Sequence, residues 1–302
     1  MTDRGILGGL HPFLKLILLV LVMLTSTIVV FILGLLAGIP FFGSELLEQI
    51  TSTGTENIRL LRYVQLLSHL GLFVVASLVF AWLVGHSPAI YLSASKSTAL
   101  QWLWISALII ILAAPMVSFL VAVNQNLSLP ESLSSLEEWM RRTEDAAEGM
   151  TRMFLEVTGW QALLFNIFLI AVIPAIGEEF IFRGALQRIF HQWTGNVHMA
   201  VIISAVLFSA MHMQFFGFLP RLLLGGVLGY MFVFTGSIWV PVFAHFFNNA
   251  VAVVLFYADH NEIIQVDMES MAKGWFAPWA ALLSLILVVW LFRILYKQVK
   301  FR

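Results

Sequence analysis

The chain has 302 residues, of which 60% are hydrophobic and only 11% are charged. Soluble domains carry roughly 45–50% apolar and about 25% charged residues, so this composition favours an integral membrane protein over a soluble enzyme. The net charge of -1 provides no basic field for nucleic acid, and the absence of cysteine excludes disulfides, thiolate catalysis and cysteine-bound zinc.

Long apolar runs recur along the whole chain. A helix needs about 20 mostly apolar residues to cross a bilayer. Runs of this kind cover residues 12–38, 62–85, 99–124, 160–190, 197–215, 218–236, 238–258 and 276–298. They are continuous rather than alternating, which argues against a membrane β-barrel. We therefore expect an all-α, polytopic transmembrane helix bundle of about eight spans, with the first run kept as a span because it is too long for a signal peptide.

A hydrophilic segment, 129–159, separates the third span from the fourth. Within it, apolar residues recur at three-, four- and seven-residue steps, at Leu133, Leu136, Met140, Ala147, Met150 and Phe154. This spacing predicts an amphipathic helix. We expect it to lie on the membrane surface, with gating of a substrate as the alternative.

The stretch "GEEFIFR" places two glutamates and an arginine at the end of the fourth apolar run. On an α-helix Glu179 and Arg183 lie about 40° apart, so they are expected to pair, whereas Glu178 points elsewhere without its own cation. A carboxylate of that kind in an apolar site is suited to general acid/base work. Pro174 is expected to kink the helix, and Gly177 to let another backbone approach closely.

Two further polar clusters follow on later helices. In "FSAMH", Phe208 and His212 share one helix face, and in "HFFNN" His245 and Asn249 do the same and can converge on one oxygen. Each cluster alone is also typical of ordinary packing or of an interhelical polar contact. Together they supply a base, a second titratable group and hydrogen-bond donors, which is what hydrolysis inside a membrane requires.

The three motifs, E-E-x-x-x-R, F-x-x-x-H and H-x-x-x-N in this order, resemble the CAAX-protease and bacteriocin-processing family of intramembrane endopeptidases, which is related to the type II prenyl-protein endopeptidases. The resemblance covers about residues 160–260. It implies a glutamate-type protease, a peptide hydrolase, in which Glu178 and His212 activate water and His245 and Asn249 form the oxyanion site. Glu179 and Arg183 would then brace the first helix, beside Phe208.

By the same analogy, the chain divides into an N-terminal part (1–159), a catalytic core of four spans (160–260) and a C-terminal span with a basic tail (261–302). No cofactor is implied. A membrane-embedded or lipidated peptide is the expected substrate, and membrane lipids are the expected surroundings. The basic tail, with Arg4 and Lys15, predicts that both termini face the cytoplasm, in the cell membrane.

Two other readings use the same residues. Zinc could be held by Glu178, His212 and His245 with a bound water as nucleophile, although no H-E-x-x-H is present. Alternatively the polar cluster serves a membrane protein without protease activity, in bacteriocin immunity, partner binding or transport.

The expected spans conflict in the depth at which they place the two motif histidines. His212 falls late in its expected span and His245 early, a difference of roughly 12 Å, so the helices must tilt or shift if the two residues meet.

Overall fold

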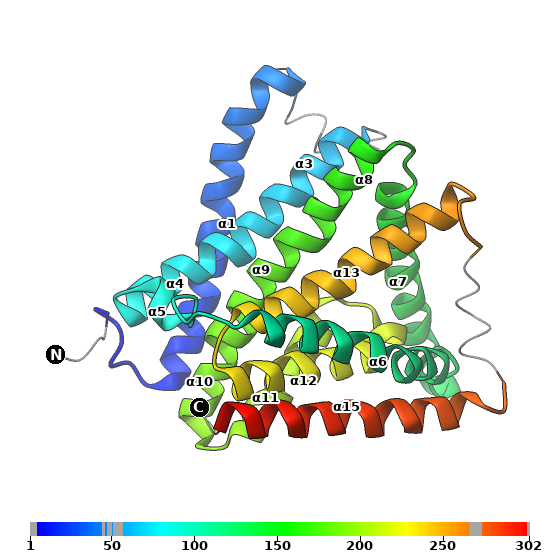
Figure 1. Ribbon diagram of the computed structural model, residues 1–302. Helices are drawn as coiled ribbons and strands as arrows, with labels where there is room; N and C mark the ends of the chain where they lie inside the picture. The colour runs from blue at the N-terminus through cyan, green and yellow to red at the C-terminus, as the bar shows by residue number, and fades with distance from the viewer. Residues whose placement is uncertain (1–4, 44–45, 47–49, 51–56, 266–273, 301–302) are drawn as a thin grey trace.

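The computed structural model describes residues 5–43, 46, 50, 57–265 and 274–300 (Figure 1). No strand occurs in these ranges. Seven helical stretches of the described chain are long and apolar enough to cross a membrane: Pro12–Phe42, Ile58–Gly85, Leu100–Gln125, Trp160–Thr194, Phe215–Thr235, Trp239–His260 and Ala277–Lys297. The prediction of an all-α, multi-pass membrane protein is therefore confirmed.

The remaining predicted span, 197–215, is a shorter helix, α11 (Val197–Met211). Its 15 residues extend about 22 Å, less than the roughly 30 Å of a hydrocarbon core. The chain leaves the helix at His212, and Met213 adopts a positive φ of 52°. A methionine in this conformation interrupts the helix, which explains why the apolar run is longer than the helix it forms.

Two of the spans are not continuous α-helices. The second consists of α3 (Ile58–His69), the π-helical segment η1 (Leu70–Val75) and α4 (Ala76–Gly85). The fourth consists of α8 (Trp160–Asn166), η3 (Ile167–Val172), α9 (Ile173–Glu179), η4 (Phe180–Leu186) and α10 (Gln187–Thr194), of which η3 and η4 are π-helical. π-helical turns occur often at functional sites.

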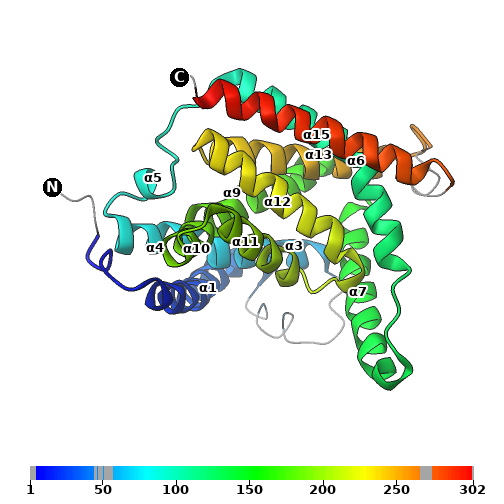
Figure 2. The same ribbon diagram turned by 90° about the horizontal axis from the view of Figure 1, so that it is seen from below.

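The helices form two groups that meet at the fourth span. In one group α6 (Leu100–Gln125), α13 (Trp239–His260) and α15 (Ala277–Lys300) run side by side, with α12 (Phe218–Thr235) packed against them (Figures 1 and 2). In the other, α1 (Pro12–Phe42) packs along η1 and α4 and touches α10. The helix α12 also contacts α11, which precedes it in the chain. A four-residue helix, α5 (Pro88–Tyr91), follows α4.

The distribution of polar side chains fits a lipid environment. Large apolar residues on α1 face outward, for example Leu24 at 55% and Leu36 at 62% exposure. Glu179 and Arg183, in contrast, are almost completely buried. Apolar side chains surround this polar interior, including Phe80, Ile181 and Phe182 on one side and Ile109, Leu228 and Met231 on another. Ionisable groups in a membrane bundle usually face its interior in this way, and they mark functional sites.

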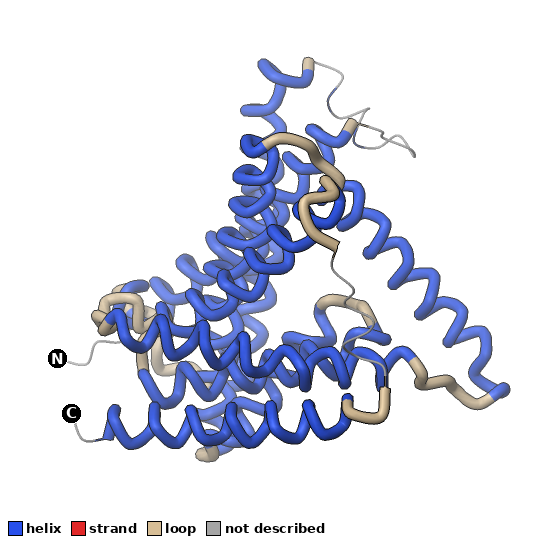
Figure 3. Tube along the Cα trace, turned by 45° about the vertical axis from the view of Figure 1, so that its right-hand side comes forward, coloured by secondary structure: helices blue, strands red, loops and turns tan. Residues whose placement is uncertain are grey.

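The predicted amphipathic segment forms α7 (Ser134–Leu155), preceded by the 3₁₀ turn η2 (Glu131–Leu133). It stands beside the bundle as a separate helix (Figure 3). At one end the carbonyl oxygen of Phe154 accepts hydrogen bonds from Arg62 and Asn166. Towards the other end, Trp139 packs on Phe215 in the short segment η5 (Phe215–Gly217). The helix thus bridges α3 and α8 to the loop after α11.

Candidate functional site

Glu179 and Arg183 make the contact that their spacing predicted. Nη1 of Arg183 lies 2.6 Å from Oε1 of Glu179, and the two side chains are 1% and 0% exposed. Nη2 of Arg183 also donates to the carbonyl oxygen of Gly225 on α12, at 3.0 Å. The guanidinium lies 4.8 Å from the centre of the Phe208 ring. This buried pair therefore joins the fourth span to both α11 and α12.

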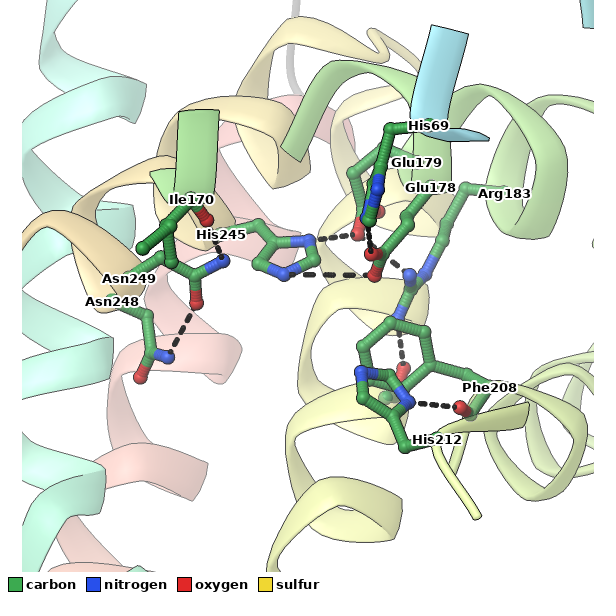
Figure 4. A network of polar contacts seen from close by, with 11 residues as sticks. His69, Ile170, Glu178, Glu179, Arg183, Phe208, His212, His245, Asn248 and Asn249 are labelled. Atoms are coloured by element: carbon green, nitrogen blue, oxygen red, sulfur yellow. Dashed lines mark hydrogen bonds and ion pairs between the residues drawn. The ribbon is translucent and has the colours of Figure 1, made fainter. Parts of the chain in front are cut away.

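The carboxylate of Glu178 is not without partners, contrary to the expectation from the helical wheel. Its Oε1 lies 3.8 Å from Nε2 of His69, and its Oε2 lies 3.9 Å from Nε2 of His245 (Figure 4). The wheel described one helix only, whereas both imidazoles come from other spans. These distances exceed a direct hydrogen bond. Glu178 is 7% exposed.

Glu179 also orients His245. Nδ1 of His245 lies 2.9 Å from Oε1 of Glu179 (Figure 4). An ionised carboxylate only accepts hydrogen bonds, so Nδ1 carries the proton, and the opposite ring nitrogen, Nε2, faces Glu178. One oxygen of Glu179 thus holds both the arginine and the histidine. The two adjacent glutamates have different environments: Glu179 makes direct contacts to Arg183 and His245 through Oε1, and Glu178 borders a cavity.

His212 follows the last residue of α11. Its Nδ1 donates to the carbonyl oxygen of Phe208 at 2.8 Å. Because a carbonyl oxygen can only accept, the neutral imidazole keeps its lone pair on Nε2. The Phe208 ring lies edge-on between the two histidines of the motifs, 5.0 Å from His212 and 5.7 Å from His245 between ring centres. This phenylalanine separates the imidazoles and limits how each can turn.

Asn249 lies one turn after His245 on α13. Its side-chain nitrogen donates to the carbonyl oxygen of Ile170 at 3.3 Å, and its side-chain oxygen accepts from Asn248 at 3.1 Å (Figure 4). An amide nitrogen has two hydrogens, so one remains for another acceptor. The sequence predicted that His245 and Asn249 serve a common oxygen. Both line the same cavity, with part of the asparagine engaged by the backbone.

The site residues surround a cavity of about 430 Å³. Its wall includes Glu178, Phe208, His212, His245 and Asn249, which the sequence analysis had selected on three separate helices. The wall also includes residues that were not predicted as site residues from the sequence: Gln65, His69, Ala147, Met150, Thr151, Phe154, Leu169, Ile170, Pro174, Gln214, Arg221, Leu224 and Asn248. His212 and His245 thus meet at one cavity despite the difference in depth expected from the predicted spans.

Gly177 sets the distance between the fourth span and the second. A Cβ atom at this position would come within 2.7 Å of Cβ of Phe73 and 3.1 Å of a methyl group of Val74, both in η1. Only glycine permits such an approach without movement of the backbone. The close packing predicted for Gly177 is present, and it brings the end of α3 to the level of Glu178.

The sequence model of the family described as "Type II CAAX prenyl endopeptidase Rce1-like" matches residues 160–251. This segment is similar to the Rce1-like family. The resemblance drawn from the three motifs is thus confirmed for this part of the chain. The Rce1-like segment begins with α8 and ends within α13, and it contains all the residues of the three motifs.

Two curated proteins of Bacillus subtilis (strain 168) are similar to part of the chain. The chain is 34% identical over 109 residues to the "Putative membrane peptidase YdiL", a match that covers 35% of this chain and 42% of that protein. It is 30% identical over 90 residues to the "Uncharacterized protein YpbD", covering 28% of this chain and 43% of that protein. The chain thus spans less than half the length of each of these relatives. No solved structure matches it.

His69 is a residue of the site that none of the three sequence motifs contains. It ends α3, outside the Rce1-like segment, and it approaches Glu178 from the second span. The only local signal is Gln65 one turn earlier, whose Nε2 lies 3.2 Å from Nδ1 of His69. A single histidine on an apolar helix is usually a packing residue, so the segment alone did not distinguish it. Its contact with Glu178 in the structure identifies it as a residue of the site.

Among the described residues, no group of three or more histidine, aspartate or glutamate side chains is arranged to hold a metal ion. The donors proposed for zinc were Glu178, His212 and His245. In this arrangement the Nδ1 atoms of both histidines are already engaged, by Phe208 and Glu179 respectively. Nε2 of each ring stays open, as in zinc-binding histidines whose second nitrogen donates to a carbonyl or carboxylate, so zinc remains an alternative to the metal-free reaction.

Proposed function

We propose that this chain is an intramembrane endopeptidase that hydrolyses a peptide bond of a membrane-associated protein or peptide. The observation that carries the proposal is the convergence of Glu178, His212, His245 and Asn249 on one cavity inside the helix bundle. The Rce1-like match and the name of one relative support the same class of reaction. The division of labour among the residues below is likewise our proposal.

Glu178 acts as the general base. It is the carboxylate that borders the cavity, and the cavity of about 430 Å³ accommodates a water molecule beside it. The carboxylate takes one proton from this water as the oxygen attacks the carbonyl carbon of the peptide. The proton then passes to the leaving nitrogen when the carbon–nitrogen bond breaks. His212 contributes the lone pair of Nε2 as a second acceptor that aligns the water.

His245 and Asn249 stabilise the oxyanion of the tetrahedral intermediate. Asn249 has one amide hydrogen beyond the one that it donates to Ile170, and His245 donates from Nε2 when it is protonated. Donors fixed in place before the reaction stabilise developing charge strongly because they do not need to reorient. Glu179 acts through His245, since its carboxylate holds Nδ1 of that ring and fixes the direction of Nε2.

The substrate class follows from the surroundings of the cavity. Apolar groups of α7 and η3, including Met150, Phe154 and Leu169, form part of its wall. We propose a membrane-embedded or lipidated peptide that enters from the bilayer beside α7, with membrane lipids as its surroundings. The first residues of α1 and the last residues of α15 lie on the same side of the bundle (Figure 1), which supports placing both termini in the cytoplasm, within the cell membrane.

The test compares membrane peptides from cells that contain the wild-type protein with those from cells that contain Glu178→Gln. Glutamine keeps the shape of the side chain and its hydrogen bonds but cannot act as a base. We expect a defined set of membrane peptides to be cleaved only in the wild-type cells. Loss of a general base lowers the rate about 10²- to 10⁴-fold.

His86→Asn is the matched control, because His86 is exposed, lies outside the cavity and has a positive φ of 56° that asparagine tolerates. Equal abundance of both variants in the membrane shows that the fold is intact. If Glu178→Gln processes the same peptides at the wild-type rate, the protease proposal fails, and a role in immunity, partner binding or transport takes its place.

A further inference from the structure

We propose that His69 is a positioning residue of the reaction centre, which holds the carboxylate of Glu178 from the side opposite His245. This inference rests on the proposed protease function and adds to it a residue from outside the Rce1-like segment. Its basis is the position of Glu178 between two imidazoles. Nε2 of His69 lies 3.8 Å from Oε1, and Nε2 of His245 lies 3.9 Å from Oε2 (Figure 4).

All three histidines of the site are fixed in the same manner. Nδ1 of His212 contacts the Phe208 carbonyl, and Nδ1 of His245 contacts Glu179. Nδ1 of His69 lies 3.2 Å from Nε2 of Gln65. When this amide donates, Nδ1 of His69 is the acceptor and the ring proton is on Nε2, directed at Glu178. The carbonyl oxygen of Gln65 lies 3.3 Å from the same Nδ1, and only the cationic ring donates to that oxygen and to Glu178 together. Each ring is therefore held through one nitrogen, and the opposite nitrogen is left for the site.

The backbone contributes to this arrangement. Gly177 lets α9 approach η1 so closely that a Cβ atom would lie 2.7 Å from Cβ of Phe73. The segment η1 begins directly after His69, and Glu178 directly follows Gly177. The packing of Gly177 on η1 therefore places the imidazole of His69 against the carboxylate of Glu178. A histidine that served only as packing would not need a polar partner on each of its two nitrogens.

His69 matters because Glu178 has few other donors. Its Oε2 makes no hydrogen bond within the described part of the chain. His245 is held by Glu179 at the same time as it faces Glu178. A buried carboxylate needs donors to remain ionised and in one orientation. Without His69, the carboxylate would keep one imidazole neighbour and would turn away from the bound water in part of the molecules.

The alternative is that His69 only packs, since its ring lies 5.5 Å from that of Phe73. Two substitutions separate these roles. His69→Phe keeps an aromatic ring of similar size and removes the donor. His69→Gln keeps an N–H donor and removes the ring. A packing role predicts that phenylalanine is the better replacement, whereas a positioning role predicts that glutamine is.

The experiment uses the full-length protein in lipid nanodiscs and an internally quenched peptide that carries a cleavage site found in the comparison of membrane peptides. Wild type, Glu178→Gln, His69→Phe, His69→Gln and the control His86→Asn are measured for kcat, KM and thermal unfolding. For His69→Phe we expect kcat to fall about 10- to 100-fold, the size expected for the loss of one hydrogen bond to a charged group. We expect KM to change by less than about threefold, His69→Gln to regain part of kcat, and His86→Asn to match wild type.

The outcomes are distinguishable. If Glu178→Gln is inactive and His69→Phe has the wild-type kcat, the inference about His69 fails while the protease function stands. A loss of kcat that is larger in His69→Phe than in His69→Gln supports positioning, whereas an equal loss or the reverse order overturns the proposal. If Glu178→Gln cleaves the peptide at the wild-type rate, the protease function itself is wrong.

Discussion

The side-chain amide of Asn249 donates to the carbonyl oxygen of Ile170 on the neighbouring span, at 3.3 Å. In a regular helix this oxygen would accept from the N–H four residues later, but that residue is Pro174, which has none. The proline of the fourth span and the asparagine of α13 are thus parts of one contact. The asparagine therefore has a structural role in addition to the catalytic one that we propose.

A double-mutant cycle separates these two roles. Asn249→Ala leaves the Ile170 carbonyl without this donor, so we expect the free energy of unfolding to fall by about 1 kcal/mol, as for a partly buried hydrogen bond. Pro174→Ala returns a backbone N–H to the same carbonyl. In the Asn249→Ala/Pro174→Ala protein we therefore expect stability to recover, as measured by thermal unfolding against each single variant.

Activity should not recover in the double variant if Asn249 serves the oxyanion. Removal of one oxyanion donor typically lowers kcat about 10²- to 10³-fold. Recovery of both stability and kcat would show that the asparagine acts only on the backbone. In that case the oxyanion site would have to be reassigned to other groups of the cavity.

The buried pair of Glu179 and Arg183 should be important for the fold. Glu179→Ala leaves the guanidinium without its carboxylate in an interior where the side chain is 1% exposed. Removing one partner of a buried ion pair costs about 3–5 kcal/mol. We expect a lower yield of folded protein and a lower midpoint of thermal unfolding than for Glu178→Gln in the same detergent.

The double variant Glu179→Ala/Arg183→Met provides the control for this prediction. Methionine removes the uncompensated charge and fills much of the same volume, so stability should return in large part. Activity should stay low, because Nδ1 of His245 has still lost its acceptor. Equal destabilisation of the single and double variants would contradict the interpretation that an unpaired charge causes the loss.

The position of α7 beside the cavity predicts an effect on substrate access. Ala147 lines the cavity, whereas the preceding residue, Ala146, is exposed on another face of the same helix. We expect Ala147→Trp to lower kcat/KM for the membrane peptide about tenfold or more, because an indole occupies a large part of a 430 Å³ space. Ala146→Trp adds the same group at the next position and should behave like wild type. Equal rates for the two variants would show that the substrate does not enter the cavity beside α7.

Removal of metal ions tests whether the hydrolysis depends on zinc. Because the described residues hold no group of three or more side chains arranged to bind a metal ion, we expect full activity after dialysis against a chelator in metal-free buffer. The measurement is the initial rate of peptide cleavage before and after addition of zinc. Loss of the rate in chelator, followed by its return with zinc, would instead establish the zinc reading with Glu178 as a ligand.

Local features of the chain were predictable because they depend on few residues. The length of each apolar run predicts a membrane helix, and four-residue spacing places Glu179 beside Arg183 whether the surrounding turn is an α-helix or, as observed, passes into the π-helix η4. The same kind of argument fails at the ends of helices. The run at 197–215 gives no indication that the helix stops at Met211.

Contacts between spans could not be predicted in the same manner. His69 precedes Glu178 by more than a hundred positions, and no spacing rule connects residues so far apart. Their approach depends on the packing of α9 against η1 at Gly177, which in turn depends on all the helices around them. The helical wheel gave Glu178 a direction relative to Glu179, but it contained no information about which side chains from other spans lie in that direction.

The sequence by itself determined that the chain is a multi-pass helical membrane protein and that its ionisable residues gather in three motifs, since hydropathy and helical spacing are local properties. Only the tertiary structure decided that the motifs share one cavity, that Asn249 serves the backbone oxygen of Ile170, and that His69 joins Glu178. These contacts arise from the shifts and close approaches of whole helices, which the packing of the complete bundle determines.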